Sequence, residues 1–398
     1  MRNPVIMRRN FPALIIVATE LGAMFVGAIL PTPLYPLYRQ VFGFSGVTLT
    51  LIYAVYVLGN VVALLFFGRL ADQIGRKTVS LPAIGVGAAS ALTFAFAAST
   101  PWLFAGRMLS GFSTGLAAGA ATAWIADLYD DRGSGAAARL AAAANFFGSA
   151  AGPLLGGLCA QFAPAPLRLC FFIYLLILAA IAGAILSAPE TVKNPKNLGD
   201  VSLRPRLGVP RGIRWQFVSP AVGGFATFSL IGFYAALIPS LLAESLHVAA
   251  PIVSGAIVCE VFGTAAVTIL LTGWLSSRTT LFTALTLLLP SAWLLVGAEI
   301  AQSPPLLFVS AALCGITGGL GYRGTLEAIN RIAPVDRRSE VVSSYLIACF
   351  AGNSVPVIGI GLLSAEAGAL FAHMTFAGVI TALAILAAIT GIKFAPKQ

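Results

Sequence analysis

Three charged side chains lie well away from the ends of long apolar stretches of the sequence, where each needs a protein partner or a polar ligand. Two are carboxylates, Glu20 and Glu260, and one is a guanidinium, Arg107. Apolar surroundings favour the protonated form of a carboxylate, whereas a nearby guanidinium favours the ionised form. A carboxylate that alternates between these settings binds and releases a proton. The residue types therefore predict proton coupling or the binding of a charged solute, with no cofactor and no metal.

The depths of Glu20 and Arg107 indicate that the two can meet. At about 1.5 Å of rise per residue, Glu20 lies about 12 Å in from one membrane surface and Arg107 about 8 Å in from the other. We predict that they form a proton-coupling pair, with Glu260 as a second proton or substrate site. The alternatives are a structural carboxylate for Glu20 and a headgroup contact for Arg107.

Twelve apolar stretches position these residues. A helix needs roughly 20 apolar residues to span a bilayer. The chain has 398 residues, of which 58% are hydrophobic and only 10% are charged. Stretches of sufficient length occur at 12–32, 47–67, 79–98, 102–126, 138–160, 168–187, 216–240, 251–274, 280–299, 305–326, 341–363 and 370–391. The composition predicts an all-α membrane protein with twelve transmembrane helices, the first of them retained because no small-residue cleavage site follows it.

The placement of the basic residues predicts the orientation of these helices. A net charge of +10 would also suit nucleic acid or anionic lipid. However, all but four of the 24 Lys and Arg residues fall in segments on one side of the predicted membrane. Arg39 and Arg168 lie on the other side, and Arg107 and Arg323 lie within apolar stretches. This bias predicts a multi-pass protein of a bacterial-type inner membrane, with both termini cytoplasmic and no nucleic-acid partner.

A repeat at about half the chain length divides the sequence. The segment 68–77 reads G-R-L-A-D-Q-I-G-R-K, and a looser copy begins at Gly273, 205 residues after Gly68. Gly315 likewise follows Gly111 at an offset of 204 residues. Between the halves lies a polar stretch rich in Pro and basic residues. We therefore predict a six-helix bundle over 1–188, a cytoplasmic linker over 189–215 and a second six-helix bundle over 216–398.

The segment 68–77 resembles the loop between helices two and three of the major facilitator superfamily, with its pattern G-x-L-x-D-x-x-G-R-K. The resemblance covers essentially the whole chain and implies two pseudo-symmetric bundles of six helices. It also implies a conformational latch of Gly68, Asp72, Gly75, Arg76, Lys77 and Asp127. Asp72 is expected against the start of helix eleven and Arg76 against Asp127, which would hold the halves in the outward-open state. The alternative is a basic surface loop without a latch.

Helices four, five and ten contain further residues that bear on the resemblance. Helix five contains Gly148, Gly152, Pro153, Gly156 and Gly157, a pattern typical of antiporters in the superfamily; its alternative role is close helix packing. Arg107 resembles the buried Arg of proton-coupled members, although Ser110 stands where they often have Gln. In helix ten, Arg323, Glu327 and Arg331 recur every four residues and form either a cytoplasmic gate or an interfacial ion-pair ladder.

Together these features predict a monomeric secondary active transporter in a lipid bilayer. We expect it to export a small amphipathic molecule or drug in exchange for protons. The alternatives are a proton symporter that imports a sugar or organic acid and, more remotely, a polytopic membrane enzyme or sensor. An anionic substrate would favour Arg107 and Arg323 as ligands, whereas a cationic one would favour Glu20 and Glu260. Nearby aromatic residues either bind substrate or simply pack: Tyr35, Tyr53, Tyr56, Phe225, Phe228 and Tyr234.

Overall fold

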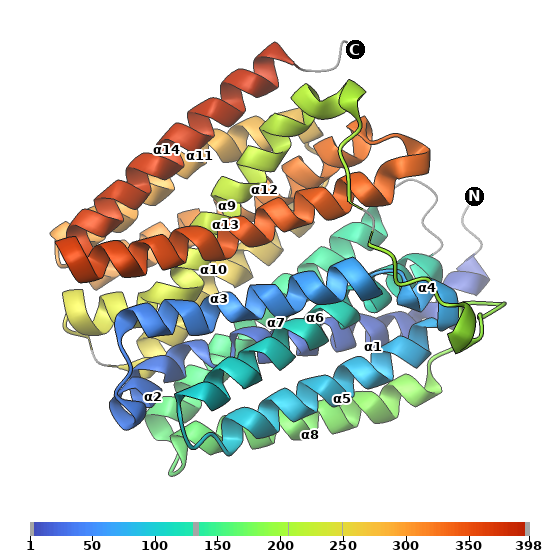
Figure 1. The fold of residues 1–398 in the computed structure, drawn as a ribbon, viewed down its shortest axis with the longest axis horizontal. Coiled ribbons are helices and arrows are strands. Elements are labelled where there is room, and N and C mark those ends of the chain that lie inside the picture. Colours follow the sequence, from blue (N-terminus) through green and yellow to red (C-terminus); the bar gives the residue numbers. More distant parts are fainter. Residues whose placement is uncertain (1–3, 130–134, 206, 249, 395–398) are drawn as a thin grey trace.

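The chain folds into long, roughly antiparallel helices (Figure 1). The computed structural model describes residues 4–129, 135–205, 207–248 and 250–394, and the regular structure within these ranges is helical. Its long helices are α1 (Pro4–Ile29), α3 (Gly46–Val62), α5 (Arg76–Ala95), α6 (Thr100–Tyr129), α7 (Ala136–Phe162), α8 (Pro166–Ser187), α9 (Arg214–Ser240), α10 (Pro251–Leu271), α11 (Ser277–Ile300), α12 (Pro304–Ile332), α13 (Arg338–Ala367) and α14 (Ala369–Lys393). Each predicted apolar stretch corresponds to one of them, which confirms the all-α fold.

Short helical elements join or extend the long ones. They are η1 (Thr32–Leu34), α2 (Tyr35–Phe42), η2 (Ala63–Phe67), α4 (Leu70–Ile74), η3 (Leu198–Asp200), η4 (Arg211–Ile213), η5 (Leu241–Ser245) and η6 (Val335–Arg337). α1 ends shortly before Pro31 and Pro33, whose rings remove backbone donors. The elements η2 and η5 are π-helical turns that continue α3 and α9.

Ten helical segments in the described ranges are long and apolar enough to cross a membrane. Helices α6 and α7 are not among them, although they contain 30 and 27 residues. Both are rich in Gly and Ala, whose small side chains lower the hydropathy but allow neighbouring helices to approach closely. Twelve helices of spanning length are therefore present, and two of these owe their place to packing rather than to strong hydrophobicity.

The helices form two similar bundles, which meet where α7 packs on α10 and α3 packs on α13. Glycine contacts show that the bundles are related. Gly111 of α6 lies against the carbonyl oxygen of Tyr56 on α3. Gly315 of α12, at the equivalent place in the second bundle, lies against the carbonyl oxygen of Val261 on α10. The repeat seen in the sequence therefore places equivalent glycines at equivalent helix crossings.

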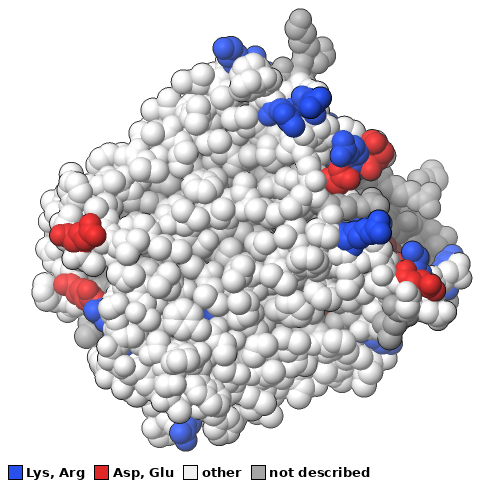
Figure 2. All heavy atoms as spheres, viewed as in Figure 1, with Lys and Arg blue, Asp and Glu red and all other residues white. Residues whose placement is uncertain are grey.

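Both described chain ends lie at the same end of the molecule. We call the end that holds Pro4 and Lys393 the terminal end and the other the distal end. The segment between α8 and α9 also crosses the terminal end (Figure 1). Figure 2 shows that charged side chains on this face gather mainly at the terminal end, with a wide uncharged belt across the middle. This distribution fits a molecule whose middle is surrounded by lipid.

Candidate functional site

Glu20 is buried inside the first bundle without a partner. Its side chain is 0% exposed, and neither carboxylate oxygen has a hydrogen-bond partner among the residues that the structure describes. The hydroxyl of Ser80, on α5, lies beside the carboxyl but not in hydrogen-bonding geometry. An isolated ionised carboxylate would be very unstable in such a place, because it has lost its water and gained neither a cation nor a donor. Glu20 is therefore a candidate proton carrier.

Arg107, on α6, occupies an aromatic cage. Its guanidinium carbon lies 5.6 Å from the centre of the Tyr35 ring and 5.3 Å from those of Tyr53 and Tyr56. Nη1 donates to the carbonyl oxygen of Ala28 on α1, whereas Nε and Nη2 have no hydrogen-bond partner within the described part of the chain. The cage holds the cation by its ring faces, but these faces supply no acceptor for the remaining N–H groups.

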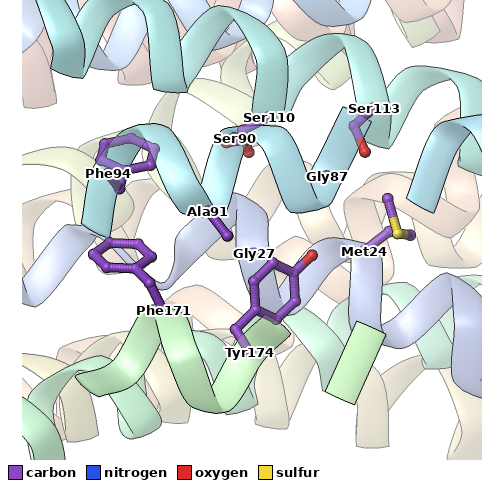
Figure 3. A pocket seen from close by; sticks show the side chains of 10 residues that line it. All are labelled: Met24, Gly27, Gly87, Ser90, Ala91, Phe94, Ser110, Ser113, Phe171 and Tyr174. Atoms are coloured by element: carbon purple, nitrogen blue, oxygen red, sulfur yellow. The ribbon is translucent and has the colours of Figure 1, made fainter. Parts of the chain in front are cut away.

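The expected pair of Glu20 and Arg107 is not formed in this conformation. Arg107 binds at Ala28, which lies eight residues beyond Glu20, about 12 Å further along the helix. A cavity of about 10 Å³ is lined by Met24, one turn beyond Glu20 on α1, and by Ser110, one turn beyond Arg107 on α6 (Figure 3). That volume is enough for one water molecule.

Glu260 lies in the second bundle, on α10. It is half-buried, and its Oε2 atom is buried without a hydrogen-bond partner. α10 is also the helix of the second bundle that packs most extensively on α7 of the first. Within the described ranges, each bundle therefore contains one carboxyl group with a buried, unpaired oxygen, and Glu20 is the more enclosed of the two.

The loop between α3 and α5 forms a charge cluster at the terminal end. Arg76 Nε donates to Asp127 Oδ2 at 3.1 Å, as the resemblance implied, and Nη1 donates to Asp72. Lys77 Nζ donates to the carbonyl oxygen of Leu186 at 3.0 Å. Asp72 was expected against the start of helix eleven, which is α13 in the structure. That contact is not formed among the described residues, and the Asp72 side chain is 53% exposed. Within the described residues the cluster therefore ties the first bundle to itself rather than to α13.

Glu190, which sequence reasoning did not single out as a site residue, completes this cluster. Its carboxylate accepts from the backbone N–H groups of Arg76 and Lys77, at 3.0 Å each, and so caps the start of α5. Partial burial raises the pKa of the Glu190 carboxyl, but four backbone N–H donors outweigh burial and hold the pKa below its usual range. Gly75 is required beside it, because its φ is 113° and a Cβ there would lie 2.7 Å from Glu190 Oε2. Gly68 instead presents its carbonyl oxygen to α6, 3.5 Å from a Cβ placed at Gly119.

The glycines of α7 separate into two faces. Gly148 and Gly152 lie against backbone atoms of α1, and Gly156 lies against Leu30, the first residue after α1, all inside the first bundle. Gly157 faces the other way, toward α10, and a Cβ there would lie 2.8 Å from the carbonyl oxygen of Pro251. Pro153 is buried on the same helix, and its carbonyl oxygen lies against Gly255 of α10. Part of this motif therefore packs the first bundle, and part of it joins the two bundles.

The bundles are in close contact toward the distal end. Gly361 of α13 lies against Thr50 of α3, and Tyr53 Oη donates to Asn353 Oδ1 of α13 at 3.2 Å. Arg39 of α2 forms an ion pair with Glu244 of η5. This pair joins two residues that sequence reasoning had left without a role. A cavity of about 230 Å³ remains beside the ion pair.

A larger cavity, the terminal cavity, opens between the bundles at the terminal end. It has a volume of about 500 Å³ and is lined by α7, α10 and α12. Arg323 donates to the carbonyl oxygens of Thr272 and Leu275 at the end of α10 and pairs with Glu327 at 2.8 Å. Arg331 forms no ion pair within the described part of the chain, so the predicted ladder stops after one step. Arg323 is held by backbone carbonyl groups just beyond α10, and Arg331 lines the cavity.

A hydrogen-bonded pair of polar residues was missed because its partners lie far apart in sequence. Glu299 at the end of α11 accepts from His373 Nδ1 of α14 at 2.6 Å, and both side chains are buried near the distal end. Each residue looks like an interfacial polar residue when only its own helix is considered. The pair ties α11 to α14 inside the second bundle.

Comparisons with known proteins agree with this architecture. A model of the Major Facilitator Superfamily matches residues 17–276. A protein of Lactococcus lactis named as a multi-drug resistance efflux pump PmrA homolog is 32% identical over 199 residues, which are 45% of this chain and 49% of that relative. The quinolone resistance protein NorA of Staphylococcus aureus is 28% identical over 202 residues, 50% of each chain. The chain thus spans about half the length of the curated relatives it matches.

A solved structure extends the likeness to nearly the whole chain. The crystal structure of a POT family transporter in complex with 5-aminolevulinic acid superposes with a TM-score of 0.76. The superposition covers 98% of this chain and 97% of that one, at 14% sequence identity. At this identity the likeness shows a common fold and carries no information on the substrate.

Proposed function

The chain belongs to the major facilitator superfamily, and we propose that it exports a small amphipathic molecule or drug in exchange for protons, by alternating access. The observation that carries the proposal is Glu20, a carboxyl enclosed in the first bundle without a cation or a donor. Such a group holds a proton while enclosed and releases it once water or a cation reaches it. The drug-efflux names of the relatives support export as the direction.

The moving units in this proposal are the two bundles, assigned to 1–188 and 216–398, with 189–215 as the linker. We place the terminal end in the cytoplasm because the basic loops lie there. The distal contacts and the 500 Å³ terminal cavity then correspond to an inward-facing state. Asp72 would contact α13 only when the terminal end closes, which explains why it pairs with Arg76 in this conformation.

We expect everted membrane vesicles that contain the protein to accumulate a radiolabelled quinolone, such as norfloxacin, when they are energised with lactate. Export from the cell corresponds to uptake into such vesicles, and the imposed proton gradient drives it. A protonophore should reduce uptake to the level of vesicles without the protein. Accumulation that persists unchanged after the protonophore would exclude proton coupling. Uptake of ethidium, a permanent cation, is measured in the same vesicles and shows how transport depends on the charge of the substrate.

A further inference from the structure

The Arg107 cage contains several buried hydrogen-bond donors for which the described residues provide no acceptor in hydrogen-bonding geometry. Arg107 Nε, Arg107 Nη2 and Tyr35 Oη are all buried without a partner, in residues with 0% exposure. No Asp or Glu of the described residues pairs with Arg107. Its guanidinium donates to the Ala28 carbonyl oxygen and lies beside the Tyr35 hydroxyl. Buried polar groups are normally satisfied, and a buried cation without a counter-charge is strongly unfavourable. The cage therefore offers donors and positive charge to an acceptor that the protein itself does not supply.

The position of the cage allows a solute to reach it. Tyr53 and Tyr56 belong to a buried cluster that includes Leu230 and Val357 of the second bundle. The bond from Tyr53 to Asn353 closes the cage across the interface between the bundles. Separation of the bundles at that interface would break this bond and expose the guanidinium together with the tyrosine rings. The cage thus lies on a surface that opens and closes during alternating access.

A second, independent observation concerns the terminal cavity. Arg331 and Arg338 line it, and neither forms an ion pair within the described ranges. Glu327, which also lines it, is already paired with Arg323. A cleft with an excess of positive charge raises the local concentration of anions and repels cations. The terminal cavity and the buried cage therefore both favour a negatively charged solute.

We propose that the transported substrate is an aromatic organic anion whose carboxylate binds Arg107 and Tyr35. This proposal rests on the proposed transport function and adds the chemical class of its substrate. Arg107 presents Nε and Nη2, which form the two-pronged donor geometry that carboxylates accept. The flat apolar body of the substrate lies along the rings of Tyr53 and Tyr56. Glu20 and Glu260 remain free to carry protons, because neither is needed as a substrate ligand.

The test is equilibrium binding to the purified full-length protein in lipid nanodiscs, with three probes of one shape. They are 2-naphthoate, its neutral amide 2-naphthamide, and the cation 2-naphthylmethylammonium. We expect naphthoate to bind at least about tenfold more tightly than the amide, because charge-assisted bidentate hydrogen bonds are roughly twice as strong as neutral ones. The cation should bind most weakly. Arg107→Ala should abolish the preference for naphthoate over the amide.

Two further variants keep the test decisive. Arg278→Ala removes an arginine outside the cage and should preserve the naphthoate preference of the wild type. Tyr35→Phe removes only one hydroxyl donor, so it should weaken naphthoate more than the amide even if Arg107→Ala fails to fold. Equal binding of the three probes, or preference for the cation, would overturn the proposal. No proton gradient is present in this assay, so such a result would leave proton-driven export standing with a different substrate class.

Discussion

Glu20→Gln is expected to abolish proton-driven transport while leaving the fold and substrate binding intact. Glutamine matches the size and hydrogen-bonding capacity of a protonated glutamic acid, but it cannot release a proton. Because Glu20 is fully enclosed without a partner in this conformation, the neutral amide should be accommodated as well as the native acid. Uptake of norfloxacin into energised everted vesicles should fall to the background level.

The same variant should retain exchange that needs no proton gradient. Vesicles preloaded with unlabelled norfloxacin should still take up labelled drug, because substrate exchange requires bundle movement but no change in protonation. Glu260→Gln is the matched control, since Glu260 also has a buried, unpaired carboxylate oxygen. Uptake at the wild-type rate by Glu20→Gln would reject this residue as the coupling site and shift the assignment to Glu260.

Gly157→Val is expected to shift the protein away from the conformation described and toward one that is open at the distal end. A Cβ at this position would lie 2.8 Å from the Pro251 carbonyl oxygen and 3.2 Å from Gly255 Cα, so α7 and α10 must separate. Overpacking of this kind costs about 1–3 kcal/mol. A free energy of that size changes the ratio of two conformations roughly 5- to 150-fold.

Spin labels at Val41 and Phe371 provide the readout, because these side chains are 63% and 56% exposed in different bundles near the distal end. Their distance distribution should gain a longer component in Gly157→Val. Gly183→Val is the matched control on α8, where a Cβ would meet no atom within 4 Å. An unchanged distribution in Gly157→Val would show that this crossing does not hold the distal end shut.

The fold could be predicted from sequence because each helix that crosses the lipid must by itself be long enough and apolar enough to do so. Apolar stretches of spanning length correctly located all the long helices, including the Gly- and Ala-rich α6 and α7. The ion pair of Arg76 with Asp127 was also expected, because segment 68–77 resembles a complete family motif and the resemblance implies the residue that its arginine contacts. These features depend on local composition or on a shared pattern, and a single sequence contains both.

The parts that could not be predicted depend on how distant helices meet. Arg107 binds at Ala28 and not at Glu20 because helix tilt and register, which residue counts do not give, set the depth of each side chain. The pair of Glu299 and His373 joins helices whose order in space was not known. Asp72 was expected at α13, but that contact depends on which end of the molecule is open. One sequence encodes several conformations, and residue spacing does not select among them.

The central claim is that substrate and protons move in opposite directions through this chain, and the most direct measurement is the pH inside sealed proteoliposomes. Purified protein is reconstituted with pyranine in the lumen and no initial pH gradient, and norfloxacin is then added outside. Antiport predicts that the lumen becomes more alkaline as the drug enters and protons leave, and that vesicles with Glu20→Gln show only the change caused by passive diffusion. Acidification of the lumen beyond the level of the Glu20→Gln vesicles would mean symport, and identical traces for both proteins would mean that transport is not coupled to protons through Glu20.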